Sequence, residues 1–379
     1  MTIDTLIYED TQWNIEDNIV DKNSTDIVFL FGDRETIKAK EYLAFLQERY
    51  PNAELIGCSS SGNILGEEIS LAPLVGTAVS LDNGYVKVST NIFTEEDEQK
   101  MMTKALVEGL PTEDLKHVFV LSDGLNMNGS SLAEGINEAV KNKVSSTGGL
   151  AGDGTNFEET WVIANGEVSQ KRVVAVGFYG EGVVVESGCY AGWDEFGVFR
   201  KITKSTNNIV YEIDGEPALD LYKKYLGIYA KDLPGSALDF PMNIKKNDTD
   251  EAIIRTILGV DEEAKSLTFA GDVPEGYLAR LMKTNIDGLI DGSEMAARQI
   301  KKINDKSALG LVVSCVGRRL VLKQLTDEEL ESIAETLGDN VQLVGFYSYG
   351  ELAPFSSELS SCSLHNQTMT LTVIYEEEK

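Results

Sequence analysis

One arrangement of apolar and polar positions occurs three times along the chain. A continuous apolar run is followed by a stretch with apolar residues at helical spacing, and then by a second apolar run that ends near glycine. Short apolar runs of this kind are typical of buried strands, and a helix between two of them provides the crossover that parallel strands require. The first runs are 26–33, 117–124 and 308–317, the helical stretches are 35–49, 130–143 and 326–337, and the second runs are 53–58, 144–149 and 341–347.

Each second run leads into a glycine-rich turn and then into another extended segment. The turns are 57–64, 148–154 and 345–352, and the extended segments are 75–81, 172–180 and 368–376. The tripeptide Asp82-Asn83-Gly84 is typical of a hairpin turn and predicts antiparallel strands on either side. The predicted fold class is therefore α/β, or mixed α+β, with repeated β-α-β-β modules forming mixed sheets that are covered by helices.

The region between the second and third modules has a different pattern. It predicts strands with a turn at Asp214-Gly215 and a helix from Pro217, a residue whose fixed φ suits the start of a helix. We place the main boundary at this turn, which divides the chain into domains 1–215 and 216–379. In the last module Thr326 is predicted to cap the helix that follows it.

Charge narrows the choice of partners. The chain has 379 residues with 62 Asp and Glu against 33 Lys and Arg, which gives a net charge of −29. Such an acidic protein repels phosphate backbones and anionic lipid headgroups, so we expect neither nucleic acid nor a membrane as partner. The first residues are acidic where a signal peptide is basic, and no apolar run is long enough to span a bilayer, so a cytoplasmic location is expected.

Cysteine and histidine usage limits metal and nucleophilic chemistry. The four cysteines are far apart and form no CxxC pair, and the only histidines are His117 and His365. Neither a metal site nor a disulfide framework is predicted. Because no basic partner lies near Cys58 in the sequence, a buried and inert thiol is the preferred interpretation of that residue, and catalysis is not expected.

Polar residues follow the strand ends, where ligands bind in open α/β sheets. The first turn offers the side chains of 58–61, whose small size also suits tight packing. Ser122 and Asp123 end another first strand, and Asp153 lies in the second turn; each acid could hold an amine or cap a turn. The candidates from these turns are Cys58, Ser59, Ser60, Ser61, Ser122, Asp123 and Asp153.

The third module adds cationic and aromatic candidates. Arg318 and Arg319 are placed at the end of a strand, where one guanidinium could bind a carboxylate or form a structural ion pair. Tyr347, Tyr349 and Glu351 would share one face if their segment is extended, forming a wall for an amphipathic or cationic ligand, or packing in the core.

Several strings in this sequence carry a resemblance to a known family. IGCSSSGNI, GGLAGDG, SCVGRRLVL, VGFYSYGELAP and LHNQTMTLTVIYE resemble the FIST family, with segments of about 25–215 and 217–360. The resemblance implies a sensory protein in intracellular signal transduction, with amino acids as proposed ligands. Some members are described as haem-containing nitric-oxide sensors, so haem is an alternative cofactor, and His365 could be an axial ligand or a pocket anchor. A single histidine on a strand is more often a structural residue, which is the other interpretation of His365.

The leading hypothesis is a non-enzymatic sensor that binds a small polar metabolite, such as an amino acid, in a cleft between the two segments. Closure of the lobes would change the surface that a separate signalling partner protein meets. The alternatives are a haem-based gas sensor and, last, an enzyme that uses Cys58 or the serine turn.

Overall fold

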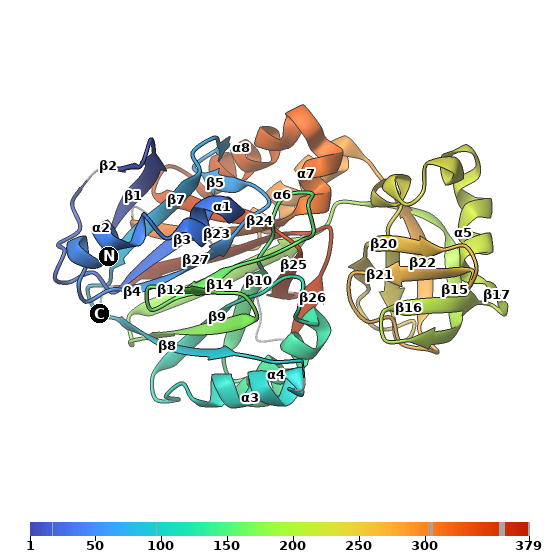
Figure 1. Ribbon diagram of the computed structural model, residues 1–379, viewed down its shortest axis with the longest axis horizontal. Coiled ribbons are helices and arrows are strands. Elements are labelled where there is room, and N and C mark those ends of the chain that lie inside the picture. Colours follow the sequence, from blue (N-terminus) through green and yellow to red (C-terminus); the bar gives the residue numbers. More distant parts are fainter. Residues whose placement is uncertain (17, 96, 302, 304–305, 356–360, 378–379) are drawn as a thin grey trace.

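The computed structural model describes the whole chain except residues 17, 96, 302, 304–305, 356–360 and 378–379. Three mixed sheets form a large body, and a small β-rich domain stands beside it, joined by two crossing segments (Figure 1). No helix in the described residues is long and apolar enough to cross a lipid bilayer.

The three predicted modules are confirmed in the body. In each module a first and a second strand pair in parallel, and the later extended strand pairs antiparallel with the first. The first strands are β3 (Ile27–Gly32), β9 (Leu115–Ser122) and β23 (Ala308–Cys315), the second are β4 (Glu54–Ser59), β10 (Ser145–Leu150) and β24 (Val341–Ser348), and the later ones are β7 (Leu74–Ser80), β13 (Arg172–Tyr179) and β27 (Met369–Glu376).

One more antiparallel strand extends each sheet beyond the later strand. These added strands are β1 (Thr2–Glu9), β8 (Tyr85–Ile92) and β14 (Val183–Tyr190), and β2 (Gln12–Glu16) lies outside β1. Because each precedes its module in the sequence, the full repeat is longer than the predicted β-α-β-β unit.

The modules exchange hairpins in a cycle. The glycine-rich turn after each second strand leads into a hairpin that pairs with the second strand of another module. The hairpin β5 (Asn63–Leu65) with β6 (Glu68–Ser70) joins β24, β11 (Val162–Ala164) with β12 (Glu167–Ser169) joins β4, and β25 (Gly350–Pro354) with β26 (Cys362–His365) joins β10. The three turns are thereby drawn to one end of the body.

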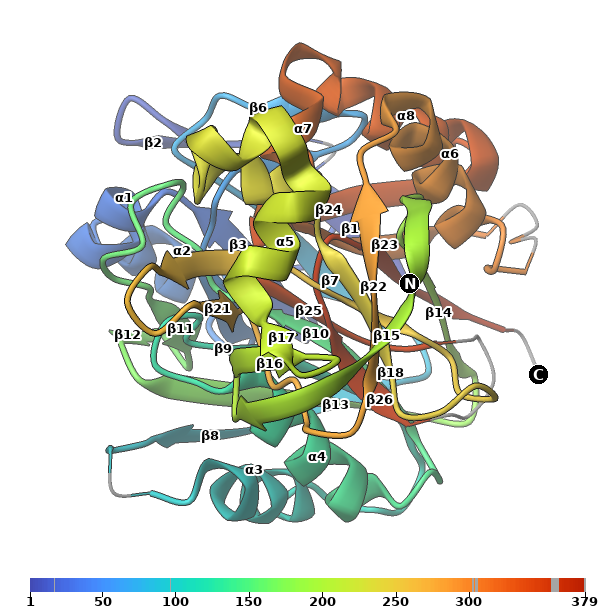
Figure 2. The same ribbon diagram turned by 90° about the vertical axis from the view of Figure 1, so that its right-hand side faces the viewer.

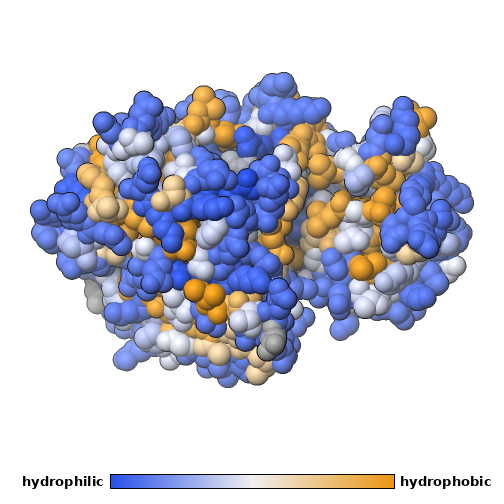
Figure 3. All heavy atoms as spheres, in the orientation of Figure 1, coloured by the Kyte–Doolittle hydropathy of each residue, from blue (hydrophilic) through white to orange (hydrophobic). Residues whose placement is uncertain are grey.

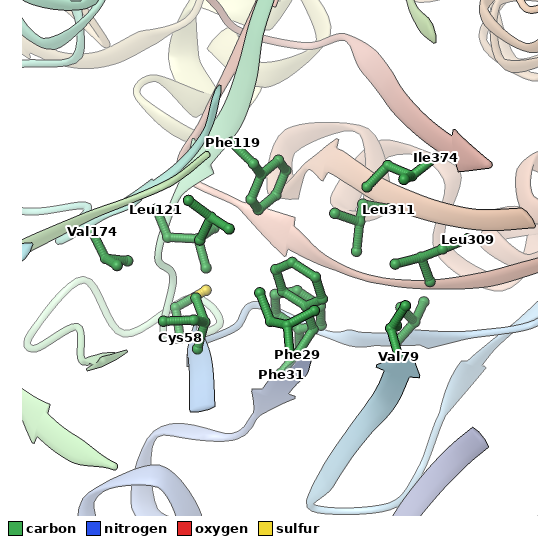
Figure 4. Packing of buried hydrophobic residues seen from close by; sticks show 14 of the residues in the cluster. Phe29, Phe31, Cys58, Val79, Phe119, Leu121, Val174, Leu309, Leu311 and Ile374 are labelled. Atoms are coloured by element: carbon green, nitrogen blue, oxygen red, sulfur yellow. The ribbon is translucent and has the colours of Figure 1, made fainter. Parts of the chain in front are cut away.

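The inner faces of the three sheets meet in a shared apolar core. Phe29 and Phe31 point towards Phe119 from the second sheet and Leu311 from the third (Figure 4). The rings of Phe29 and Phe119 lie edge to face, with centroids 5.8 Å apart. Cys58 belongs to this core, so the predicted assignment as a buried thiol is correct.

Helices cover the outer face of each sheet. The third module is covered by α6 (Ile286–Ala297) and α8 (Thr326–Leu337), and α7 (Val316–Leu322) lies between β23 and α8. The second module is covered by α3 (Gln99–Glu108) and α4 (Gly129–Val140), and the first by α1 (Arg34–Ala39) and α2 (Leu43–Arg49). The single helix predicted over 35–49 is wrong, because Lys40 adopts a left-handed conformation that ends α1.

The small domain is inserted into the third module, between β14 and α6. It has its own apolar core, and α5 (Ala218–Leu226) packs on its sheet (Figure 2). Short 3-10 turns η1 (Gly227–Asp232) and η2 (Gly235–Asp239) follow α5. The strands are β15 (Asp194–Thr206), β16 (Ile209–Ile213), β17 (Glu216–Pro217), β18 (Met242–Lys245), β19 (Ile253–Arg255), β20 (Ile257–Asp261), β21 (Ser266–Phe269) and β22 (Leu278–Lys283).

The boundary predicted at 215/216 passes through this small domain. β15 and β16 lie before that position and pair with β22 and β21 after it. The two sequence segments therefore do not coincide with the body and the small domain.

Two local expectations also differ from the structure. The Asp82-Asn83-Gly84 turn does not close a hairpin, because β7 belongs to the first sheet and β8 to the second. Thr326 begins α8 without capping it, since its hydroxyl donates to the carbonyl of Lys323, 2.5 Å away, the first residue of η3 (Lys323–Leu325).

Candidate functional site

A cleft of about 530 Å³ lies between the body and the small domain. Hydrophobic residues gather on both sides of the gap between these two units (Figure 3). The cleft is bounded on the body side by residues around 124–129, 315–317 and 364–366, and on the small-domain side by residues around 234–238, 256–258 and 269–271. The body side uses the loop that follows β9 and the junction between β23 and α7.

The wall of the cleft combines apolar and neutral polar side chains. The larger apolar residues are Leu125, Met127, Leu150, Phe157, Leu238, Ile257, Leu258, Phe269, Val316, Leu320 and Leu364. The polar residues of the wall carry amide, hydroxyl or thiol groups. They are Gln99, Asn126, Asn128, Asn208, Thr256, Cys315, Tyr349 and Asn366. Such a wall suits a ligand with a large apolar part and a few uncharged hydrogen-bonding groups.

Asp123 shapes the body side of the cleft from behind. Its carboxylate accepts hydrogen bonds from the backbone N–H groups of Leu125 and Asn126, both at 2.9 Å, and from that of Lys171 at 2.7 Å. The hydroxyl of Thr160 donates to the same carboxylate at 2.8 Å. Asp123 is fully buried and holds the loop that lines the cleft, which is the capping role considered as an alternative for it.

A pair of aromatic rings forms one end of the cleft. Phe157 and Tyr349 stack with centroids 4.6 Å apart and an angle of 12° between the rings. The Tyr349 hydroxyl donates to the Asp153 carboxylate and to the Gly154 carbonyl. Burial acts to raise the pKa of Asp153, but hydrogen bonds from Tyr349 and from backbone N–H groups outweigh it and lower the pKa below its ordinary value.

Polar contacts hold the small domain against the body beside the cleft. Arg255 of β19 donates to the Leu364 carbonyl of β26 at 2.8 Å, and burial lowers the pKa of this guanidinium to about 10. The amide of Asn128, at the start of α4, donates to Asp272 of the small domain at 3.0 Å. These contacts fix the width of the cleft in this structure.

The three glycine-rich turns meet behind the body side of the cleft. The backbone N–H of Ser61 donates to the Tyr347 carbonyl at 2.8 Å, and that of Gly152 donates to the Ser59 carbonyl at 3.0 Å. The hydroxyls of the first turn serve the turns themselves: Ser59 accepts from the Trp161 N–H, and Ser60 donates to the Asn63 side chain.

Of the thirteen candidate residues, Tyr349 alone is among the described residues that line the cleft. Cys58 lies in the core, where burial raises the pKa of its thiol well above the ordinary value. Ser61 bonds to Gly154, and Ser122 is fully buried in β9. The turns that hold these residues were correctly grouped, but they form a scaffold behind the wall.

The arginine pair is not at a strand end, because β23 stops at Cys315 and α7 begins at Val316. Arg318 is fully buried and donates from Nε and Nη2 to Glu329 Oε2, at 3.0 and 2.8 Å. Arg319 donates to the Ser61 carbonyl, and its guanidinium lies 5.8 Å from the Tyr347 ring centroid. Both guanidinium groups therefore bind the protein itself.

The expected Tyr347–Tyr349–Glu351 wall does not form, because the chain leaves β24 after Ser348 and enters β25 at Gly350. Tyr347 donates its hydroxyl to Glu329 at 2.7 Å. Glu351 is fully buried and accepts from Ser348 and Thr368. Burial raises the pKa of Glu351 to about 7, although these hydrogen bonds act in the opposite direction.

The imidazoles do not fit a haem in this cleft. His365 is buried and donates from Nε2 to the Ala353 carbonyl at 3.0 Å, and burial lowers its pKa to about 4. Both ring nitrogens of His117 bond to hydroxyls, at 2.7 Å each, and burial lowers its pKa to about 3. Within the described residues, no group of three or more His, Cys, Asp or Glu side chains is placed to hold a metal ion.

Most of the cleft wall was not found from the sequence. Leu258 and Phe269 come from the small domain, whose position against the body is not encoded in any local pattern. Phe157 lies in the largely polar stretch GTNFEETW, where nothing in the sequence distinguishes it as a ligand contact. The sequence block around His365 lies at the cleft, but Asn366, the next residue, lines it in place of the histidine.

Comparison with known proteins gives a family and a distant relative. A model of the FIST N domain matches residues 26–216, and a model of the FIST C domain matches residues 218–354. An uncharacterized protein of Methanocaldococcus jannaschii is 24% identical over 363 residues, which cover 86% of this chain and 69% of that protein.

Two solved structures share a loose overall similarity. A cyanuric acid hydrolase from A. caulinodans aligns over 100% of this chain and 99% of its own, with 8% identity and a TM-score of 0.40. A second cyanuric acid hydrolase aligns over 99% of both chains, with 10% identity and a TM-score of 0.36. A likeness of this size carries no argument about activity.

Proposed function

The chain belongs to the FIST family, whose domains are sensory domains of signal transduction. From this premise we propose that it senses a small, uncharged, largely apolar molecule, which binds between the body and the small domain. In this proposal the protein binds its ligand without transforming it.

The observation that carries the proposal is the composition of the cleft wall. Aliphatic and aromatic side chains make up most of it, and amide and hydroxyl groups supply the polar contacts. A volume of about 530 Å³ is typical of sites for small organic molecules. Burying apolar surface there would stabilise the bound state by about 25 cal/mol for each Å² removed from water.

This chemistry favours an uncharged ligand over a free amino acid. A carboxylate in the cleft would need a cation or several N–H donors to offset its loss of hydration. The guanidinium of Arg318 is committed to Glu329, and that of Arg319 to the Ser61 carbonyl. An amide or ester of an amino acid, or another neutral amphipathic molecule, suits the wall better.

The output would follow from the two-sided construction of the cleft. A ligand that contacts both walls favours the arrangement in which the walls are close, in proportion to its difference in affinity for the two arrangements. The surface shared by the body and the small domain would then change, and a separate signalling partner protein would respond to that change.

Thermal unfolding with a panel of small molecules tests the proposal. The panel contains free amino acids, their amides, other neutral amphipathic compounds and haemin. The variant Ala270→Trp places a large ring in the cleft, and Ala264→Trp makes the same change at an exposed turn of the small domain, outside the cleft.

We expect neutral members of the panel to raise the melting temperature of the wild type and of Ala264→Trp. A ligand at 100 times its dissociation constant adds about 2.7 kcal/mol to the free energy of unfolding. Ala270→Trp should lose this shift while remaining folded. Stabilisation that survives in Ala270→Trp, or that comes from charged amino acids and not from neutral compounds, would refute the proposed site or its ligand class.

A further inference from the structure

Phe157 combines two features that are unusual for a large apolar residue. Its backbone is in the left-handed region, with a φ of 54°, where bulky side chains are rarely found. Its side chain is 48% exposed and lines the cleft. Residues held in this way occur where the surrounding structure enforces the conformation, often at sites of recognition.

The loop around Phe157 is fixed by Asp153 of its own module and by Arg34 of the first module. Asp153 accepts hydrogen bonds from the backbone N–H groups of Phe157, Glu158 and Glu159, at 2.9, 3.0 and 3.1 Å. Arg34 of the first module forms ion pairs with Asp153 at 3.2 Å and with Glu158 at 2.8 Å. The position of the Phe157 ring is therefore set by its surroundings before any ligand arrives.

The ring has one covered face and one open side. Tyr349 stacks on Phe157, and the Tyr349 hydroxyl is held by Asp153 and by the Gly154 carbonyl. Since one face of Phe157 rests on this anchored ring, its exposed surface is the other face and the outer edge. The facing wall of the cleft supplies apolar side chains of the small domain, including Leu258 and Phe269.

We infer that Phe157 is the recognition surface for a planar ring, so that the ligand of the cleft is an uncharged molecule with an aromatic or conjugated ring. The inference rests on the proposed function and specifies its ligand class. Aromatic rings stack in offset or edge-to-face geometry, and a preformed stacked pair offers a third ring a flat surface without further ordering of the loop.

Two variants separate recognition from a structural role. Phe157→Gly removes the ring and relieves the left-handed backbone, because glycine adopts this conformation without a steric penalty. Phe157→Leu keeps an apolar side chain but removes the flat face. Phe157→Trp serves as the conservative variant, because it retains a planar ring at the same position.

The probes are phenylacetamide and cyclohexylacetamide, two neutral amides of similar size that differ in having a planar or a saturated ring. Titration followed by ligand-observed NMR gives both dissociation constants. We expect the wild type and Phe157→Trp to prefer phenylacetamide. In Phe157→Gly and Phe157→Leu its affinity should fall about tenfold and that of cyclohexylacetamide by much less, which removes the preference.

The melting temperature of unliganded Phe157→Gly should stay at or above the wild-type value, so a loss of binding there is not a loss of fold. The inference is overturned if the wild type shows no aromatic preference, or if the preference survives in Phe157→Leu and Phe157→Gly. A third outcome separates the two proposals: only non-planar compounds of the wider panel bind, and Ala270→Trp abolishes their binding. In that case the inference about Phe157 is overturned, while the proposed function stands. If no compound binds at all, both proposals fail.

Discussion

The buried ion pair between Arg318 and Glu329 allows a quantitative test of how the body is held together. Both side chains are fully buried. We predict that Arg318→Met strongly destabilises the protein, because the methionine fills the space but leaves the Glu329 carboxylate without its cation. The sequence left this arginine open as a ligand clamp or as a structural ion pair, and the test decides between these two roles.

The magnitude follows from the contacts that are lost. Arg318 donates to Glu329, to the carbonyls of Ala191 and Leu289 at 2.5 and 2.7 Å, and to the Ser293 hydroxyl at 2.9 Å. Removing one partner of a buried ion pair typically costs about 3–5 kcal/mol, because the remaining charge is desolvated without compensation. We expect a loss in this range.

Urea denaturation measures the effect, and an exposed pair provides the matched control. Arg298 and Glu294 form an ion pair on the surface of α6, with 61% and 36% of their side chains exposed. Exposed pairs contribute up to about 1 kcal/mol, so Arg298→Met should shift the urea midpoint only slightly. The double variant Arg318→Met/Glu329→Gln should recover part of the loss, because the uncompensated charge is removed with its partner.

The reasoning would be refuted by a loss below about 1 kcal/mol for Arg318→Met, which would put the buried pair in the same range as the exposed one. It would also be refuted if the double variant were no more stable than Arg318→Met. A loss of ligand affinity with unchanged stability would instead favour the binding role that the sequence suggested.

Two further predictions concern a buried acid and a close backbone contact. Burial raises the pKa of Glu351 to about 7 from its ordinary value of 4.5. The folded protein therefore holds this proton more tightly than the unfolded chain, which stabilises the fold by about 3 kcal/mol below pH 4.5. This contribution is lost as the pH rises from 4.5 through 7. The two buried histidines have lowered pKa values, so they reduce the free energy of unfolding as the pH falls below 6.5. The measurement is therefore the difference in unfolding free energy between the wild type and Glu351→Gln, followed from about pH 4.5 to about 7.5, in which the histidine effect cancels. A difference that does not vary with pH would contradict the raised pKa of Glu351. Gly57→Ala should prevent folding, seen as loss of the cooperative unfolding transition, because a Cβ there would lie 1.9 Å from the Leu30 carbonyl oxygen. Gly66→Ala, at a turn with no atom within 4 Å of the added Cβ, should cost only about 1 kcal/mol, and equal behaviour of the two variants would show that the contact is unimportant.

The modules were predictable because their information is local. A buried parallel strand shows itself as a short apolar run, and the crossover helix as an apolar stripe, so β3, β9 and β23 were found within a few residues. The exchange of hairpins was not predictable. Asn63–Leu65 carries no mark that its partner is β24, which lies in the last module of the chain.

The site was harder to predict for the same reason. The glycine-rich turns lie against one another, but their hydroxyls and acids form hydrogen bonds that hold the turns together. Asp153 illustrates this: its carboxylate binds the loop and Tyr349 rather than a ligand. The cleft itself depends on where an inserted domain lies, and Phe157 depends on a backbone conformation that its residue type disfavours.

The cyclic exchange of hairpins makes the body indivisible. A fragment ending between the two family segments would keep β5–β6 without β24 and would leave β10 without β25, so the hairpin β5–β6 and the second sheet would each present an unpaired edge. Unpaired edges are templates for aggregation, and half of the chain should therefore fail to fold alone although it contains two complete repeats. The junction between β14 and α6 lies outside the ring of exchanges, which explains how this body could accept an entire domain there and remain intact.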